Sequence, residues 1–265
     1  MKKKSSSFSW RRLGLGVAGF AIVAAGWEAF AMSGVFSQAL APPLGKIFET
    51  LFHLLAHGDI LKHTLYTLLR VLVGLTLACV IGIPLGMLMG RMRAAERFFL
   101  PLVSVLMPIP SLAWVPLFIL WFGLGNITTV LVVLYASSYP VIYNVWTGVR
   151  GVNPLWLKAG AAMGADRQAL FWKVVLPGSL PFVFSGIRLA FGRAWIAVIG
   201  GELLAGTVWG LGTLIFDAKE FLQTSTMMVA LIFIGVIGLA VERLVFQRIE
   251  EITVARWGMI AGARR

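Results

Sequence analysis

Charge is scarce in this chain. Among its 265 residues, Asp, Glu, Lys and Arg together make up 13%, whereas apolar residues make up 59%. A typical soluble domain is about 25% charged, so water is not the solvent that this composition implies. Stretches without any charge at residues 71–89, 127–149 and 221–241 have about the 20 residues that a helix needs to cross a bilayer. The sequence therefore predicts an all-α, polytopic membrane protein.

Cysteine, histidine and nucleotide-binding motifs are also scarce or absent. The single cysteine, Cys79, excludes an internal disulfide. No Gly-x-x-x-x-Gly-Lys-Ser/Thr phosphate loop and no His-Glu-x-x-His motif occurs, which argues against ATP hydrolysis or metalloenzyme chemistry by this chain. His53, His57 and His63 are expected on the outer side of the membrane, and His53 with His57 would still lack a third metal ligand. We therefore expect no metal, no cofactor and no catalytic residue in this chain.

Basic residues outnumber acidic ones, and their positions alternate along the chain. The 23 Lys and Arg against 11 Asp and Glu give a net charge of +12, which in a soluble protein would suggest nucleic-acid binding. Here the basic residues gather at residues 2–12, 91–97, 150–173 and 243–265, between alternate apolar stretches. This positive-inside pattern predicts a lipid-embedded protein with both termini cytoplasmic and no nucleic-acid partner.

One membrane domain, residues 13–246, is expected between a basic cytoplasmic amino terminus at 1–12 and a cytoplasmic tail at 247–265. Its spans are predicted at residues 13–34, 66–90, 98–122, 127–149, 181–205 and 226–246. The first span has the form of a signal peptide, but its apolar run continues past Glu28, which favours an uncleaved span. Residues 41–62 contain an amphipathic stretch that is predicted to lie on the outer surface.

The third predicted span is rich in proline. Pro101, Pro108, Pro110 and Pro116 each remove a backbone donor and clash with the preceding turn, so this span must be kinked or unwound. Such backbone survives in a membrane only where protein surrounds it or where it lines a cavity. The span is therefore predicted in the interior of the bundle.

The longest inner connection, residues 150–180, exceeds what a turn between spans requires. Pro154 can start a helix, Asp166 can cap a second short helix after Gly164, and Pro177 is expected to stop that helix. Small and apolar residues recur at helical spacing on one face of the first helix: Leu155, Ala159, Ala162 and Met163. The loop is either a surface into which another protein fits or a helix pair lying on the inner membrane face.

This loop resembles the cytoplasmic motif of the inner-membrane permeases of binding-protein-dependent ABC importers. That motif is Glu-Ala-Ala, three residues, Gly, nine residues, then Ile-x-Leu-Pro. Here Gly164 is followed after nine residues by Val-Val-Leu-Pro at 174–177, and Lys158-Ala159-Gly160 stands at the triplet. Lysine replaces the family glutamate and glycine the second alanine, so residue 158 is left without an assigned role.

Segments along nearly the whole chain are similar to the nitrate, sulfonate and taurine branch of this family. They lie at residues 70–90, 108–116, 122–125, 186–194 and 210–224. The resemblance implies the type I ABC importer permease fold, a bundle of about six transmembrane helices with a cytoplasmic coupling-helix loop. It also implies a location in the bacterial cytoplasmic (inner) membrane, a second copy of this chain, two cytoplasmic ATP-binding subunits that bind ATP and Mg, and an external solute-binding protein.

The resemblance further places the cytoplasmic loop, residues 154–177, against the ATPase. The residues implied at this coupling surface are Lys158, Ala159, Gly160, Ala161, Ala162, Gly164, Ala165, Asp166, Leu176 and Pro177.

Polar groups and prolines within the predicted spans are candidates for a translocation path. They are Pro108, Pro110, Ser111, Trp114, Ser138, Tyr139, Asn144, Arg193 and Glu202. Arg193 and Glu202 are not expected to pair, because they lie about 13 Å apart along a straight helix. Glu202 is either a pathway residue or a buried strut, and Arg188 and Arg193 either anchor the inner leaflet or attract anions. Hydroxyl and amide groups can equally serve packing between helices.

These features predict a transport subunit and not an enzyme. The expected function is that of the permease of an ATP-driven importer for a small solute such as an organic sulfonate, taurine, nitrate or a similar anion. A secondary transporter without an ATPase is the alternative, although no inverted repeat or acidic pair is evident in the sequence.

Overall fold

The computed structural model describes residues 10–249, and this part of the chain is helical, without β-strands. Its α-helices are α1 (Trp10–Met32), α2 (Leu44–Ala56), α3 (Asp59–Arg91), α4 (Arg93–Leu106), α5 (Val115–Phe122), α6 (Asn126–Arg150), α7 (Pro154–Ala162), α8 (Arg167–Leu170), α9 (Leu176–Leu204), α10 (Leu211–Glu220) and α11 (Thr224–Val241).

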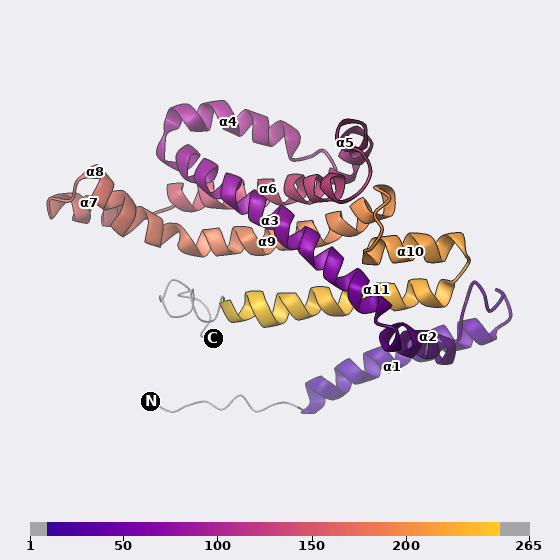
Figure 1. The fold of residues 1–265 in the computed structure, drawn as a ribbon. Coiled ribbons are helices and arrows are strands. Elements are labelled where there is room, and N and C mark those ends of the chain that lie inside the picture. The colour runs from indigo at the N-terminus through magenta and orange to yellow at the C-terminus, as the bar shows by residue number, and fades with distance from the viewer. Residues whose placement is uncertain (1–9, 250–265) are drawn as a thin grey trace.

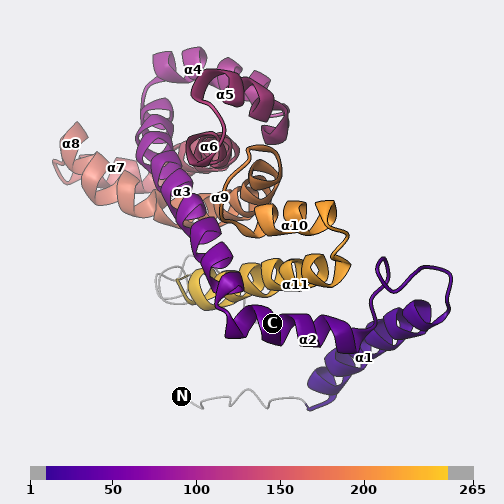
Figure 2. The same ribbon diagram turned by 45° about the vertical axis from the view of Figure 1, so that its right-hand side comes forward.

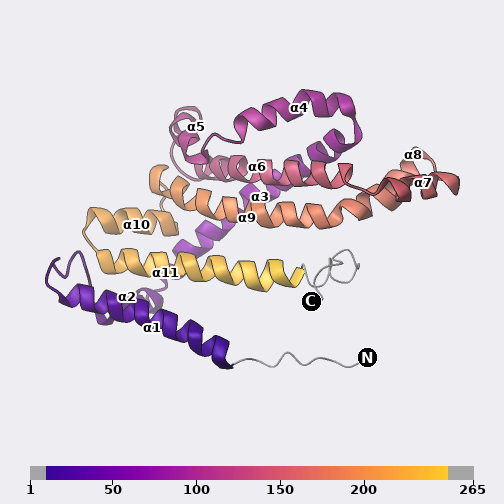
Figure 3. The same ribbon diagram turned by 180° about the vertical axis from the view of Figure 1, so that it is seen from behind.

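Helices α3, α6 and α9 form the centre of the bundle (Figure 1). Helices α4 and α5 lie on one side of α6, while α11 and then α1 with α2 lie beyond α9, and the same order is seen from behind (Figure 3). Helices α7 and α8 project from one end of the bundle, and α10 lies towards the opposite end (Figure 2). The two ends of the bundle are therefore built from different segments.

The close contact of α3 with α6 depends on small side chains. On α3 they recur at every fourth position: Gly74, Ala78, Gly82, Gly86 and Gly90. A Cβ atom at Gly86 would lie only 2.8 Å from the backbone oxygen of Ile142 in α6. Small residues at this spacing let membrane helices approach closely, which is how they associate where lipid removes the hydrophobic driving force.

Larger apolar side chains hold α9 against α3, α6 and α11. Val71 of α3, Val133 of α6 and Trp195 of α9 belong to one buried cluster, which Ile234 and Ile237 of α11 contact. The Trp195 indole also donates a hydrogen bond to the backbone oxygen of Ile234 at 3.2 Å. A tryptophan N–H needs such a partner when it is buried, so this bond fixes the position of α11 along α9.

The proline-rich segment, expected as one kinked span at residues 98–122, is a pair of helices that meet at an angle of 89°. Helix α4 ends before Pro108 and Pro110, and a short 3₁₀ turn then leads into α5. The hydroxyl of Tyr135 in α6 donates a hydrogen bond to the backbone oxygen of Leu106 at 2.8 Å. The same carbonyl also accepts a hydrogen bond from the N–H of Ile109 at 3.1 Å, so this backbone group at the break is satisfied inside the protein, as a membrane requires.

Four helical segments are long and apolar enough to cross a membrane: α3, α6, α8 joined to α9, and α11 with its extension. The bent pair of α4 and α5 adds a fifth if it counts as one span, and the apolar part of α1, Ala18–Met32, is shorter. The predicted terminal segments 1–12 and 247–265 lie largely outside the described residues.

Pro177 does not stop the second helix of the cytoplasmic loop, contrary to expectation. Helix α8, a π-helical turn at Phe171–Val175 and α9 continue as one helix from Arg167 to Leu204. The π turn shifts the hydrogen-bond register directly before the proline. The missing N–H and the bulk of the proline ring are therefore accommodated where a regular α-helix would break.

Candidate translocation cavity and coupling loop

Helices α7 and α8 make a short hairpin beyond the end of the bundle (Figure 1). The side chain of Asn153 accepts a hydrogen bond from the N–H of Leu155 at 2.9 Å, and that of Asp166 accepts one from Ala169 at 2.7 Å. Each bond satisfies a donor that the first helical turn leaves without a partner. The expected cap at Asp166 is therefore present, and it gives this residue a structural role in the hairpin.

Two glycines shape this hairpin in different ways. Gly160 is buried, and a Cβ atom there would lie 2.6 Å from the side chain of Leu170 in α8. Gly164, in the turn, has a φ of +81° with open space around it. The first glycine is required for close approach of α7 to α8, and the second for a left-handed backbone that a side chain disfavours.

One face of α7, together with Met163 directly after it, exposes small and apolar residues. Leu155 is 68% and Met163 82% exposed, and Ala159 and Ala162 on the same helical face are exposed as well. Lys158 is also exposed. Leu176 and Pro177, which were predicted with this surface, lie farther along the chain at the start of α9.

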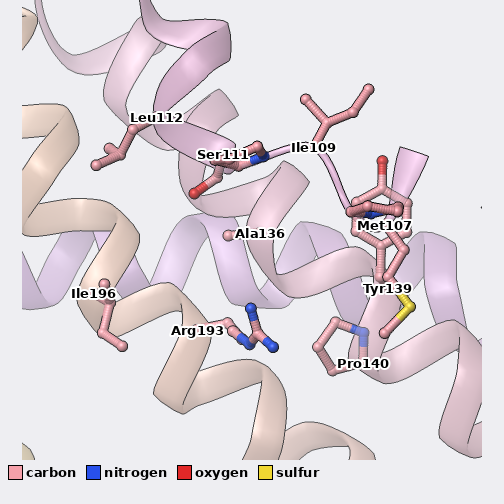
Figure 4. Close-up of a pocket in the computed structure, with 11 residues that line it drawn as sticks. Met107, Ile109, Ser111, Leu112, Ala136, Tyr139, Pro140, Arg193 and Ile196 are labelled. Atoms are coloured by element: carbon pink, nitrogen blue, oxygen red, sulfur yellow. The ribbon is translucent and has the colours of Figure 1, made fainter. Parts of the chain in front are cut away.

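A cavity of about 430 Å³ opens where the proline-rich break faces α6 and α9 (Figure 4). It is lined by predicted pathway residues from three parts of the chain: Pro108, Pro110 and Ser111 at the break, Tyr139 in α6, and Arg193 in α9. The remaining lining residues are mostly apolar, and Arg193 is the single charged residue among them. The break in the third predicted span thus forms a cavity wall.

The other predicted pathway residues do not line this cavity. Ser138 and Asn144 each donate a hydrogen bond to a backbone oxygen four residues earlier in α6, at 2.6 and 2.8 Å. Trp114 stacks on Phe118, with ring centroids 5.9 Å apart. Glu202 lies in a separate, buried network. These four side chains are engaged in contacts within the subunit.

The two arginines of α9 differ in their partners. Arg188 forms a salt bridge with Glu242 at 2.5 Å, and its Nε donates to the same carboxylate at 2.7 Å. Arg193 is exposed, and within residues 10–249 it has no hydrogen-bond or ion-pair partner. Figure 4 shows its guanidinium extending from α9 into the cavity.

Glu202 is 1% exposed and pairs with Arg70 of α3 at 2.5 Å, not with Arg193. The Nε and Nη2 atoms of Arg70 donate to the side-chain oxygen of Asn126 in α6 at 2.9 and 2.7 Å. The hydroxyl of Thr67 lies 2.9 and 3.0 Å from the two carboxylate oxygens of Glu202. This network joins α3, α6 and α9, and it agrees with Glu202 as a buried strut.

The same network caps helix α10. The N–H of Gly212 donates to the Glu202 carboxylate at 2.9 Å, and the N–H of Leu211 donates to the Thr67 hydroxyl at 2.9 Å. A carboxylate at a helix N-terminus accepts hydrogen bonds from free N–H groups and is attracted by the positive end of the helix dipole. The caps come from other helices, so α10 is fixed to the core of the bundle.

His63, near the start of α3, is buried within the protein. It is 6% exposed inside α3, and its Nδ1 lies 2.6 Å from the backbone oxygen and 3.0 Å from the backbone nitrogen of Gly210. Burial of His63 follows from α10 folding back over α3, a contact between distant parts of the sequence. The imidazole rings of His53 and His57 stack with their centroids 4.2 Å apart. Residues 10–249 contain no group of three or more His, Cys, Asp or Glu side chains placed to hold a metal.

Arg70 and Asn126 were missed as functional candidates. Both stand at the edges of predicted spans, where arginine and asparagine are unremarkable. The available signal was Glu202 itself, because a carboxylate at membrane depth requires a cation or donors nearby. Which of the arginines provides the charge depends on how the helices pack.

The model of the family described as "Binding-protein-dependent transport system inner membrane component" matches residues 82–256. An ABC transporter permease protein of Methanocaldococcus jannaschii is 34% identical over 221 residues, which cover 82% of each chain. The taurine transport system permease protein TauC of Escherichia coli is 30% identical over 88% of this chain and 86% of its own length. The bicarbonate transport system permease protein CmpB of Synechococcus elongatus is 31% identical over 87% and 84%.

Among solved structures, the MetNI methionine ABC transporter in an inward-facing conformation matches with a TM-score of 0.56 at 19% identity. The match covers 69% of this chain and 93% of the other chain. The fold is therefore that of the type I importer permeases, as the sequence predicted. On the family match and these relatives, the chain belongs to the inner-membrane components of binding-protein-dependent transport systems, the permease subunits of ABC importers.

Proposed function

We propose that two copies of this chain form the translocation path of an importer for a small anion. In this proposal separate cytoplasmic subunits bind and hydrolyse ATP with Mg, and an external solute-binding protein delivers the solute. The names of the taurine and bicarbonate permeases support a solute with an oxyanion group, since taurine carries a sulfonate and bicarbonate is itself an oxyanion. Both termini would lie in the cytoplasm, on the same side as α7 and α8.

The observation that carries the proposal is the exposed face of α7. Exposed side chains run along α7 and Met163 directly after it, in a hairpin that projects from the bundle: Leu155, Ala159, Ala162 and Met163. Small side chains let another protein approach the helix backbone closely, and exposed Leu155 and Met163 offer apolar area to bury. The hairpin is continuous with α9, so a movement imposed on α7 and α8 would reach the helix that carries Arg193.

The cavity between the proline-rich break and α9 is the proposed place of solute passage. Pro108, Pro110, Ser111, Tyr139 and Arg193 line it. Trp114, Ser138, Asn144 and Glu202, whose polar groups face other parts of the subunit, support this path through packing.

The coupling role is tested with Ala159→Trp in the full importer, reconstituted with its ATP-binding subunits and solute-binding protein. A bulky ring on the exposed face should weaken co-purification of the ATP-binding subunits and lower uptake at least about tenfold, because close approach is lost. Ala94→Trp is the matched control, since Ala94 is an exposed alanine of α4 outside the hairpin. Normal uptake by the Ala159 variant would refute the coupling role, and uptake driven by an ion gradient without any ATPase would instead indicate a secondary transporter.

A further inference from the structure

The position of Arg193 along α9 makes its charge costly. The residue lies about 16 Å from the helix end at Leu204, and farther from the other end, at 1.5 Å per residue. That distance exceeds the reach of an arginine side chain, so the guanidinium cannot snorkel to the end of the helix. Charged groups at such depth face the bundle interior or a water-filled cavity, or they pair with another group.

Within the described chain no acidic group is left to neutralise Arg193. Glu202 is paired with Arg70, and Glu242 is paired with Arg188. Glu96 is paired with Arg150. The other acidic residues described lie in α1, α2, the start of α3, the cap of α8, and α10: Glu28, Glu49, Asp59, Asp166, Asp217 and Glu220. Within the described residues of one copy, Arg193 therefore has no carboxylate with which to pair.

The cavity suits a small anion with oxygen atoms. Its volume of about 430 Å³ lies in the usual range of small-molecule sites. Arg193 is the single charged residue of its lining, and Ser111 and Tyr139 contribute hydroxyl-bearing side chains. A guanidinium presents a planar fork of donors that matches a carboxylate or a similar oxyanion at two points.

We infer that Arg193 is the anion-recognition group of this cavity and selects solutes that carry a sulfonate, carboxylate or similar oxyanion group. The inference rests on the proposed function as a permease, and it assigns to one side chain the preference for solutes with an oxyanion group over solutes without one. Arg188, on the same helix and already paired with Glu242, has no such role.

The charge of the cavity is measured with Ser111→Cys in a Cys79→Ala background, where the new thiol is the only one in the chain. The full-length permease in lipid nanodiscs is treated with an anionic or a cationic methanethiosulfonate reagent. The anionic reagent should react faster, and Arg193→Gln should lower the ratio of the two rates at least about tenfold, because one positive charge is removed from a site of reduced dielectric constant. Arg188→Gln should leave the ratio unchanged.

Binding of an oxyanion is measured separately, as the decrease in the rate at which the same thiol reacts with a neutral methanethiosulfonate reagent when a small solute is added. Methanesulfonate should slow the reaction and the neutral isostere dimethyl sulfone should not. Arg193→Gln should abolish this protection, whereas Arg193→Lys, which keeps the charge but loses the planar fork, should retain the rate ratio and weaken the protection.

Three results would overturn the inference: a thiol that reacts with neither charged reagent, a rate ratio that Arg193→Gln leaves intact, or the absence of protection by methanesulfonate in the presence of Arg193. Neither assay uses nucleotide or the ATP-binding subunits. Failure of the coupling experiment with Ala159→Trp would therefore leave these results interpretable.

Discussion

The arginines of the core helices differ chiefly in how their charges are neutralised. Arg70 is buried against Glu202 and Asn126, Arg188 forms a half-exposed pair, and Arg193 faces a cavity. A buried ion pair is costly to break from one side because the remaining charge stays in a medium of low dielectric constant. Single substitutions should therefore have different effects at these sites.

Arg70→Met leaves the carboxylate of Glu202 buried without its cation. We expect the free energy of unfolding to fall by about 3–5 kcal/mol, the usual cost of removing one partner of a buried pair. Thermal unfolding in detergent, followed by tryptophan fluorescence, measures the loss. Arg188→Met is the control: its side chain and that of Glu242 are 40% and 38% exposed, so a loss of about 0–1 kcal/mol is expected. Equal losses in the two variants would contradict the role of Glu202 as a strut.

Gly212 is a second residue at which the packing around Glu202 can be tested. A Cβ atom there would lie 2.5 Å from the backbone oxygen of Ile199 and 2.8 Å from the Cβ of Glu202. Gly212→Ala should destabilise the protein by about 1–3 kcal/mol, as overpacking does, in the same unfolding measurement. Gly235→Ala in α11 has open space around it and should be neutral or slightly stabilising. A stable Gly212 variant would mean that α10 is not held tightly against α9.

At the scale of secondary-structure elements, the hairpin is short, with nine residues in α7 and four in α8. Its shape depends on two caps, on a left-handed turn at Gly164 and on the contact of Gly160 with Leu170. Glycine stands at residue 160 where the family motif has alanine. The contact explains this difference, since the side chain of Leu170 fills the space that an alanine methyl group would need.

Gly160→Val should push α7 away from α8 and lower the uptake of the reconstituted importer without lowering the amount of permease in the membrane. The obstacle is the end of a flexible side chain, so Leu170→Ala in the same chain should restore part of the uptake. Uptake and ATP hydrolysis are measured together, because loss of coupling lowers transport per ATP. A double variant no better than Gly160→Val would contradict this account, since contacting residues are expected to be coupled.

At the scale of the whole molecule, the hairpin and α10 lie towards opposite ends of the helical bundle (Figure 1). If the helices cross a bilayer, residues at the two ends must face different compartments. This arrangement, together with the excess of basic residues in alternate connections, predicts the cytoplasm on the side of α7 and α8.

Membrane-impermeant thiol reagents test this orientation in a Cys79→Ala background. Ala162→Cys in α7 should react only when the reagent reaches the cytoplasmic side, and Glu220→Cys in α10 only from the outside. Both positions are exposed in the subunit, so in the permease expressed without its ATP-binding subunits neither should fail to react for lack of access. Labelling of both residues from one side would overturn the predicted topology.

Membership of the permease family and the helical membrane fold were predictable from the sequence. Apolar runs of bilayer length and the alternation of basic residues can be read directly along the chain. The family motif is equally readable, because it depends only on the number of residues between Gly164 and the Leu-Pro at 176–177. The start of α7 at Pro154 and the cap at Asp166 were equally local, because each depends on neighbours within a few residues.

Only the tertiary structure decided which polar groups meet. Glu202 pairs with Arg70, and His63 is buried against Gly210, although each pair is more than 130 positions apart in the chain. Within the cap of α10, only the contact of Gly212 with Glu202 joins residues close in sequence. The continuation of α9 through Pro177 depended on a π turn that residue propensities do not indicate. Arg188 and Arg193 were alike in the sequence and differ because the carboxylate of Glu242, in the π-helical turn that follows α11, reaches Arg188 and not Arg193. Local sequence thus determined the helices and the family, whereas helix packing determined which charges are neutralised.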